Sequence, residues 1–538
     1  MKKAILILIP LLIALTLRLY PILISGMPFS TDAWPLIRNT ELLIQNTPIP
    51  LASNIFDGYN NFWPASQLFG VILSQITALP AITAMAFGIP IAATLTIPIF
   101  YLLVKKITQN KTISLIAATL LATAFPYALF TAGATKETFA SPIYISLILI
   151  FMLKHNWKTT LLFGTASLAL VLTHHLTAFL AVGIMTSLSI ASLISKKNKN
   201  EKVNSNQSNI LFIAILSSIT ALYFVLFAAP AFTLTITLSV LLSVGAYQIF
   251  VIALILYLVS RMRTKNFSKI RTIFNSFLGF LLVIGLFFLT TRIPLLPGAP
   301  TLPFYYLLYA LPFIVGLPLV IFGLKELYQK NSSLMIPLFW IITVAAFASY
   351  AIFANPPGGI SFVYRSVNFI LPPLTILVAI GLYKLFSNPK NLKTHKITML
   401  IATAIIIFMV TISTYTVYAA VSLQEPYLGY FWRYEPTEYK AANWVALNVN
   451  NQTVTGDVKV RYLLNGYFNE SVSVIDGLRF LEGNGSKPKI LYVYNQMYIN
   501  GYVLYEGSPI TLPDNWTNKL IDYNFVYANS EVTIYATR

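Results

Sequence analysis

The chain has 538 residues, of which 57% are hydrophobic and only 10% charged. A soluble protein carries about 25% charged residues, so this composition predicts a polytopic membrane protein. With no cysteine, disulfides, thiolate metal sites and cysteine nucleophiles are excluded, and four histidines leave little room for a histidine-rich metal cluster. The net charge of +19 does not indicate nucleic acid, because the basic residues gather in short segments between apolar runs.

The N-terminal apolar run follows Lys2 and Lys3 and extends from Ala4 to about Ser25. It is longer than a signal-peptide core and has no small-residue cleavage site, so we expect a retained first span with a cytoplasmic N-terminus. A span needs about 20 mostly apolar residues. The sequence predicts about 13 spans, at residues 4–25, 84–104, 112–130, 139–153, 159–175, 177–195, 210–228, 234–259, 272–291, 303–324, 334–354, 369–387 and 397–420.

The basic residues give this layout an orientation. Of 27 lysines and arginines before residue 424, 22 fall in segments that the layout assigns to the cytoplasm. Such an excess is typical of the cytoplasmic side of a membrane protein. The other five lie on or near the outer side, and they are Arg18, Arg38, Lys136, Arg292 and Arg365.

Two segments are expected outside the cell. The first outer loop covers residues 26–83, and within it the short apolar stretch 66–80 is predicted to be a helix lying on the outer leaflet. The second is a mixed α/β domain at residues 424–538, which follows the membrane domain at 1–423. EPTEYKAANWVALNV predicts a helix there, and SVSVI, KILYVY and VTIYA predict strands.

Acidic residues are scarce in the membrane domain. Only six of the 17 precede residue 424, and four of them lie between apolar runs, namely Asp32, Glu41, Asp57 and Glu137. A carboxylate beside a membrane is costly unless it is paired, solvated or bound to metal, so these residues indicate chemistry or structure. Asp32 precedes a short predicted helix and could cap it. Glu137 follows the third span and could pair with neighbouring Lys136.

Basic and histidine side chains are predicted on the same side. His174 and His175 end the fifth span, and Arg365 lies in a loop that opens the twelfth. An arginine can bind phosphate oxygens with two N–H groups, although a loop arginine often forms an ordinary ion pair. Histidines at the end of a span often serve packing alone, but a pair on this side makes His174 and His175 candidates for binding the phosphate. Arg38 is a further candidate for the phosphate site.

Together these residues predict a site for a phosphorylated lipid. Asp32 and Glu137 could hold a divalent cation, Mg²⁺ or Mn²⁺. The cation and Arg365 could then stabilise a phosphate leaving group. Because the protein lies in a membrane, we expect a lipid phosphate, and the chemistry that fits is glycosyl transfer from a polyprenyl-phosphate sugar to an extracytoplasmic protein or glycan.

The architecture resembles the GT-C glycosyltransferase superfamily, in particular the catalytic subunit of oligosaccharyltransferase. TDAWPLIRNTELL resembles the acidic motif of the family's first outer loop, which implies that Asp32 is catalytic and binds metal. AGATKETFA resembles the second acidic motif, which implies the same for Glu137, with Lys136 where an acid or amide is expected. THHLTAF is similar to a histidine element of archaeal GT-C proteins, and the composition also fits an archaeal cell membrane.

The sequence departs from this family at two places. The WWDYG motif that recognises the acceptor is absent, and the corresponding region reads TGDVKVRYLLNGY. Residues 292–302, RIPLLPGAPTL, lack the glutamate of the family's late outer loop. The resemblance therefore implies a GT-C enzyme more than a protein N-glycosyltransferase. A lipid or glycan flippase and a non-catalytic GT-C-like scaffold are alternatives, although the sequence shows no internal repeat of the kind found in transporters.

Overall fold

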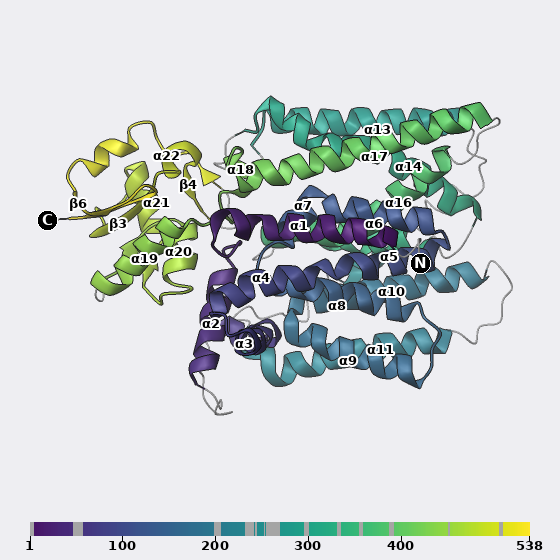
Figure 1. Ribbon diagram of the computed structural model, residues 1–538, viewed down its shortest axis with the longest axis horizontal. Coiled ribbons are helices and arrows are strands. Elements are labelled where there is room, and N and C mark those ends of the chain that lie inside the picture. Colours follow the sequence, from purple (N-terminus) through teal and green to yellow (C-terminus); the bar gives the residue numbers. More distant parts are fainter. Residues whose placement is uncertain are drawn as a thin grey trace.

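The computed structural model describes residues 5–46, 58–197, 206–231, 242, 245–251, 253, 269–294, 301–330, 335–353, 359–386, 392–449, 452–504 and 509–537. Long helices lie roughly side by side in a bundle, and a region containing a β-sheet caps one end of it (Figure 1). We call residues 424–538 the sheet region. The N-terminal helix begins at the opposite end of the bundle.

Seven helical segments among the described residues are long and apolar enough to cross a membrane, and shorter apolar helices accompany them. The chain is therefore a multi-pass membrane protein in its architecture, and the number of 13 spans stays a prediction. The expected span at 234–259 falls largely outside the described residues. The helices of the bundle are α1 (Leu8–Ser25), α4 (Ala81–Thr94), α5 (Thr96–Thr108), α6 (Lys111–Thr123), α7 (Phe125–Phe130), α8 (Lys136–Phe151), α9 (Trp157–Thr173), α10 (His175–Lys197), α11 (Asn206–Tyr223), α13 (Lys269–Thr290), α14 (Leu307–Lys330), α15 (Met335–Phe353), α16 (Gly359–Phe386) and α17 (Leu392–Val421).

Two helices of the predicted first outer loop lie beside the sheet region and do not follow the direction of the bundle (Figure 1). They are α2 (Ala33–Gln45) and α3 (Ala65–Thr77). The apolar stretch at 66–80 thus forms a short helix, as expected. Trp34 of α2 is fully buried against Tyr434, Tyr439 and Tyr467 of the sheet region, with ring centroids 5.1–5.8 Å apart. This aromatic contact fixes the start of α2 to the sheet region.

The sheet region is mixed α/β. Its five-stranded sheet has the order β2-β1-β3-β7-β6, with parallel pairs among β2, β1 and β3 and antiparallel pairs among β3, β7 and β6. Every residue of β3 is buried, which fits a central strand. The helix predicted at 435–449 and the three predicted strands are all present. The elements are α18 (Pro426–Gly429), α19 (Pro436–Asn448), β1 (Val454–Thr455), α20 (Val458–Leu464), β2 (Val472–Ser473), α21 (Ile475–Glu482), β3 (Ile490–Tyr494), α22 (Met497–Asn500), β4 (Tyr502–Val503), β5 (Pro509–Ile510), β6 (Asn524–Ala528) and β7 (Val532–Ala536).

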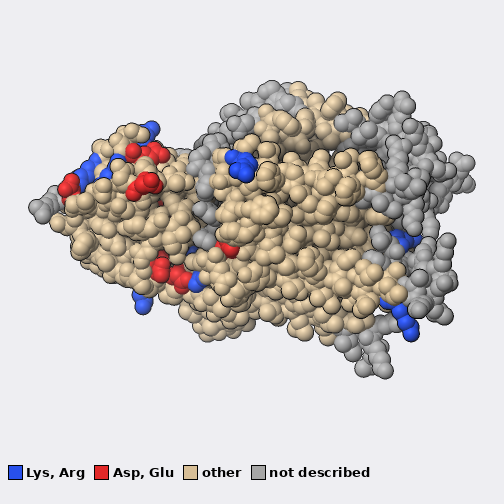
Figure 2. Space-filling model, turned by 90° about the horizontal axis from the view of Figure 1, so that it is seen from above, with Lys and Arg blue, Asp and Glu red and all other residues tan. Residues whose placement is uncertain are grey.

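Charge is distributed unevenly over the described surface. Acidic and basic side chains mix on the sheet region and at its junction with the bundle, whereas the flank of the bundle is almost free of charge (Figure 2). At the far end of the bundle the visible charged side chains are basic. An uncharged band between two charged ends is the pattern expected of a protein that spans a bilayer.

Candidate active site

Asp32 lies at the N-terminal end of α2. It occupies the capping position, but its side chain makes no capping hydrogen bond. Instead its Oδ2 accepts a hydrogen bond from Nη2 of Arg365 at 2.9 Å. The side chain of Asp32 is 33% exposed. The carboxylate is thus held in place by an arginine and is still accessible, so the explanation of Asp32 as a helix cap does not hold.

Glu137 lies in the first turn of α8, which Thr135 caps by accepting a hydrogen bond from the backbone N–H of Thr138 at 3.1 Å. Its carboxylate is buried. Oε1 accepts a hydrogen bond from Nδ2 of Asn368 at 2.6 Å, and Oε2 lies 3.5 Å from Nη1 of Arg365. Burial raises the pKa of Glu137, while Arg365 and Asn368 oppose this shift by stabilising the charged form.

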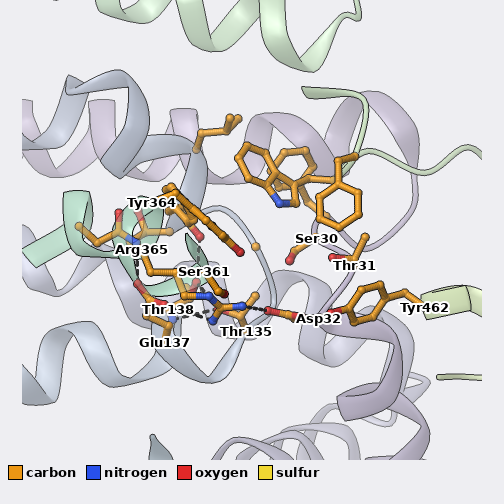
Figure 3. Close-up of a pocket in the computed structure, with 18 of the residues that line it drawn as sticks. Ser30, Thr31, Asp32, Thr135, Glu137, Thr138, Ser361, Tyr364, Arg365 and Tyr462 are labelled. Carbon is orange, nitrogen blue, oxygen red and sulfur yellow. Dashed lines mark hydrogen bonds and ion pairs between the residues drawn. The ribbon is translucent and has the colours of Figure 1, made fainter. Parts of the chain in front are cut away.

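Arg365 joins the two carboxylates. Figure 3 shows its side chain between Asp32 and Glu137. The carboxylates are therefore separated by no more than these two contacts and the width of one guanidinium. The prediction that Arg365 lies in a loop was wrong, because α16 begins at Gly359 and Arg365 stands in its second turn. The predicted twelfth span at 369–387 left out the segment SFVYRSVN, which is helical and belongs to the apolar stretch Ser361–Lys384.

Two cavities share these three residues. One, of about 300 Å³, lies toward the sheet region, and we call it the sheet-side cavity. The sheet region contributes Trp432, Arg461 and Tyr462 to its lining. The other, of about 460 Å³, adds Lys136, His174 and His175, and we call it the basic cavity. The bridge from Asp32 through Arg365 to Glu137 thus borders both spaces.

The basic cavity has a lysine and two histidines beside the bridge. The ammonium of Lys136 lies 5.4 Å from the ring centroid of Trp63, which also packs against His175 at 4.6 Å. Nδ1 of His174 is 2.6 Å from Oγ1 of Thr177. Burial lowers the pKa of Lys136 to about 7, and the charge of Asp32 opposes this shift. These groups could meet the negative charge of a phosphate.

Not every residue predicted for the site lines these cavities. Arg38 lies on α2 but is in the lining of neither cavity. Glu41, on the same helix, accepts a hydrogen bond from the Tyr467 hydroxyl at 3.1 Å and so contacts the sheet region. Asp57 lies outside the described residues. Arg18, on the membrane helix α1, is fully buried and packs over Tyr127 at 5.6 Å.

Several residues that line the cavities were not predicted from the sequence. Ser361, Tyr364 and Asn368 accompany Arg365 on α16 at spacings of three and four residues, which is the spacing of one helix face. That pattern could have been read from the sequence. Arg461 and Tyr462 of α20 had no such pattern, because they lie in the stretch where the expected WWDYG motif is absent.

The predicted divalent cation does not fit the side chains as they are arranged. Among the described residues, no group of three or more His, Asp or Glu side chains is placed to hold a metal ion. Asp32 and Glu137 both contact Arg365, and Lys136 lines the same cavity. A Ca²⁺ or Mg²⁺ ion takes six or more oxygen ligands, so it would have to displace the guanidinium and lie beside a second cation.

Comparison with known proteins identifies solved structures that have a similar fold. No family model and no curated protein matches the sequence. Among solved structures, the archaeal oligosaccharyltransferase AglB from Archaeoglobus fulgidus, in complex with an inhibitory peptide and a dolichol-phosphate, is similar with a TM-score of 0.62 and 14% identity over 100% of this chain and 74% of that chain. The same enzyme in complex with Zn and sulfate gives a TM-score of 0.59 and 16% identity over 99% and 73%.

ArnT from Cupriavidus metallidurans in the apo state is a more distant neighbour, with a TM-score of 0.49 and 10% identity over 100% of this chain and 98% of that chain. At these identities a likeness shows the fold and not the activity. The alignment with the archaeal oligosaccharyltransferase runs through the whole bundle and into the sheet region, as the full coverage of this chain requires. The chain therefore has the fold of the archaeal oligosaccharyltransferase, a protein of the kind that its sequence resembles.

Proposed function

We propose that this protein is a membrane glycosyltransferase that moves a sugar or glycan from a polyprenyl-phosphate donor to an acceptor outside the cytoplasm. The observation that carries the proposal is the bridge from exposed Asp32 through Arg365 to buried Glu137, located between two cavities. The fold supports it, since the similar archaeal oligosaccharyltransferase has been solved with a dolichol-phosphate and a peptide.

The basic cavity is the proposed donor site. Lys136, His174, His175 and Arg365 line it, and a lipid phosphate carries the negative charge that such groups attract. Leu176 and Phe362 add apolar surface from two helices of the bundle, where the lipid portion of a donor would lie. The sheet-side cavity is the proposed acceptor site, because the sheet region, which we place outside the cell, contributes part of its wall.

The reaction is a single displacement. An N–H or O–H group of the acceptor attacks the anomeric carbon of the sugar, and a bond forms between the acceptor heteroatom and that carbon. The bond between the carbon and the phosphate oxygen breaks, and its electron pair leaves with the phosphate. The acceptor proton passes to Asp32, the more accessible of the two carboxylates. One displacement inverts the configuration at the sugar carbon.

Arg365 and Glu137 have supporting parts in this reaction. The guanidinium stabilises the negative charge that develops on the leaving phosphate, as cationic clamps do in other group transfers. Glu137, held by Asn368, fixes the orientation of Arg365. No step is assigned to a divalent cation. The sequence predicts such an ion, but the arrangement of the side chains does not fit it.

The test is transfer by the purified protein. Labelled polyprenyl-phosphate sugars are incubated with the protein and with peptide or glycan acceptors, and the label is followed into product or into free sugar. Asp32→Asn keeps the shape of the side chain but removes the base, so we expect transfer to fall by about 10²–10⁴-fold. Glu41→Gln is the matched control, because Glu41 lies on the same helix outside both cavities.

Full activity of Asp32→Asn would reject the role of Asp32. A flippase would give a different result, with labelled lipid moving across a vesicle membrane and no new glycosidic bond. A non-catalytic scaffold would give neither transfer nor hydrolysis with any donor. The assay therefore distinguishes the proposed enzyme from both alternatives.

A further inference from the structure

The space between the two candidate metal ligands is already filled by a side chain. Arg365 donates to Oδ2 of Asp32 at 2.9 Å through Nη2, and its Nη1 lies 3.5 Å from Oε2 of Glu137. The other oxygen of Glu137 is engaged by Asn368. Three side-chain nitrogens, two from Arg365 and one from Asn368, thus contact three of the four carboxylate oxygens that a metal ion would use.

The cluster also holds as many basic groups as acidic ones. Two carboxylates, Asp32 and Glu137, face two cationic groups, Arg365 and Lys136, and the four line the basic cavity together. A divalent ion entering between the carboxylates would add two positive charges next to a guanidinium that cannot lose its proton. Like charges at contact distance repel strongly in a partly buried site. The cluster therefore disfavours a metal ion and needs none to neutralise its acids.

From this geometry we propose that Arg365 is the resident cation of the site, and that this protein transfers sugar without a divalent metal. Sugar transfer without a metal rests on the proposed function. The role of Arg365 as the cation of the site concerns ion binding alone. The sequence agrees with it, because Lys136 stands where an acid or amide was expected and residues 292–302 contain no acid.

An arginine can also supply what the metal would supply to the leaving group. Nη1 and Nη2 each contact one carboxylate oxygen, and each of these nitrogens carries a second N–H group. A guanidinium has five N–H donors in a planar fork that matches a phosphate. Arg365 therefore has donors left for phosphate oxygens after it has bound both acids.

The first experiment measures ion binding without any substrate. Mn²⁺ is added to the full-length purified protein in detergent, and bound ion is followed by the loss of the free Mn²⁺ signal in electron paramagnetic resonance. We expect no site-specific binding by the wild type. Arg365→Gln removes the guanidinium and leaves both carboxylates uncompensated, so we expect this variant to bind Mn²⁺. The double variant Arg365→Gln, Asp32→Asn should lose that binding again.

The second experiment measures transfer with and without EDTA. Unchanged activity in EDTA supports the proposal, and a complete loss that Mn²⁺ or Mg²⁺ restores would overturn it. Wild-type Mn²⁺ binding that Asp32→Asn abolishes would also overturn it, and this measurement does not depend on the folding of Arg365→Gln. If no donor is ever transferred, the proposed function fails, while the Mn²⁺ measurement still decides whether Arg365 occupies the cation site.

Discussion

Asp32 and Glu137 share one arginine but differ in access. The side chain of Asp32 is 33% exposed and that of Glu137 is 9% exposed. A group that exchanges a proton with a substrate has to be reached by it, whereas a group that orients an arginine does not. This difference supports the proposed division, with the chemistry on Asp32 and the positioning on Glu137, whereas the family resemblance implies one catalytic and metal-binding role for both.

Lys136 provides a pH test of the donor site. Burial lowers its pKa to about 7, so its ammonium is charged below that pH and becomes neutral as the pH rises through it. If the charged form binds the donor phosphate, the KM for the donor should rise by about tenfold or more between pH 6 and pH 8.5, since a charge-assisted hydrogen bond contributes about 1.5–3 kcal/mol. Initial rates at varied donor concentration measure this.

The matched variants separate charge from shape. Lys136→Arg stays cationic over the whole range, so its KM should change little with pH. Lys136→Met has no charge at any pH, and its KM should be high throughout. A wild-type KM that is independent of pH, together with a normal KM for Lys136→Met, would remove Lys136 from the donor site.

The site residues that could be predicted from the sequence are those with a local sequence pattern, and those that depend on contacts between distant helices could not. Asp32, Glu137, His174 and His175 were found because polar groups at the ends of apolar runs are conspicuous in an acid-poor chain. The bridge by Arg365 could not be derived, because it joins α2, α8 and α16 through side-chain geometry. Arg38 was predicted from its presence on the outer side alone, and the packing of α2 leaves it outside both cavities.

At the scale of elements, α16 connects the membrane interior with the site. Its first three turns carry Ser361, Tyr364, Arg365 and Asn368 to the sheet-side cavity, and the helix packs in the bundle against α14 and α15. A rigid helix therefore sets the position of Arg365 relative to α8 and α2. Any change that moves α16 should therefore also move Arg365 relative to Asp32 and Glu137.

Close packing of α16 on α14 depends on glycine. A Cβ built on Gly381 would overlap the backbone carbonyl of Leu319, and one built on Gly323 would overlap that of Leu377. Gly381→Ala should therefore push the two helices apart and destabilise the protein by about 1–3 kcal/mol, the usual cost of overpacking. Thermal unfolding of the detergent-solubilised protein would show this as a midpoint lowered by several degrees.

Gly285→Ala is the control for this prediction. Gly285 lies in α13, and a Cβ there meets no atom within 4 Å. Because alanine favours a helix by up to about 1 kcal/mol over glycine, this variant should be as stable as the wild type or slightly more stable. Equal midpoints for Gly381→Ala and Gly285→Ala would show that the α14–α16 contact can relax.

The sequence predicted the kinds of element better than their limits. Apolar runs located the bundle helices, since about 20 apolar residues leave few alternatives. The predicted span began at residue 369, whereas α16 begins ten residues earlier, at Gly359. The segment between the two starts contains polar and aromatic residues. Hydropathy reports burial in lipid, whereas a helix can continue into a polar site once tertiary contacts support it.

At the scale of the molecule, the sheet region and the bundle form one functional unit. Trp34 stands two residues after Asp32 and is buried among three tyrosines of the sheet region, while Tyr462 and Trp432 reach the sheet-side cavity. The sequence predicts two domains, a membrane domain and an outer domain. It could not show that the first outer loop packs against the second part, because aromatic contacts between distant segments leave no local pattern.

Orientation in the membrane gives a whole-molecule prediction. The asymmetry of 22 against 5 basic residues predicts that the sheet region lies outside the cell and the α5–α6 connection inside. Because the chain has no cysteine, a single introduced thiol reports its own side without background. Ser530→Cys, exposed beside β7, should react with a membrane-impermeant maleimide in intact cells. Thr112→Cys, exposed at the start of α6, should react only after permeabilisation.

The same labelling experiment tests on which side of the membrane the proposed reaction takes place. The sheet region caps one end of the bundle (Figure 1), and its Tyr462 lines both cavities, so the labelling of Ser530→Cys also locates the site. A transferase for polyprenyl-linked sugars on exported acceptors requires this end to be outside. Labelling of Thr112→Cys in intact cells, with Ser530→Cys protected until lysis, would invert the protein, place Asp32 in the cytoplasm and contradict an extracytoplasmic acceptor.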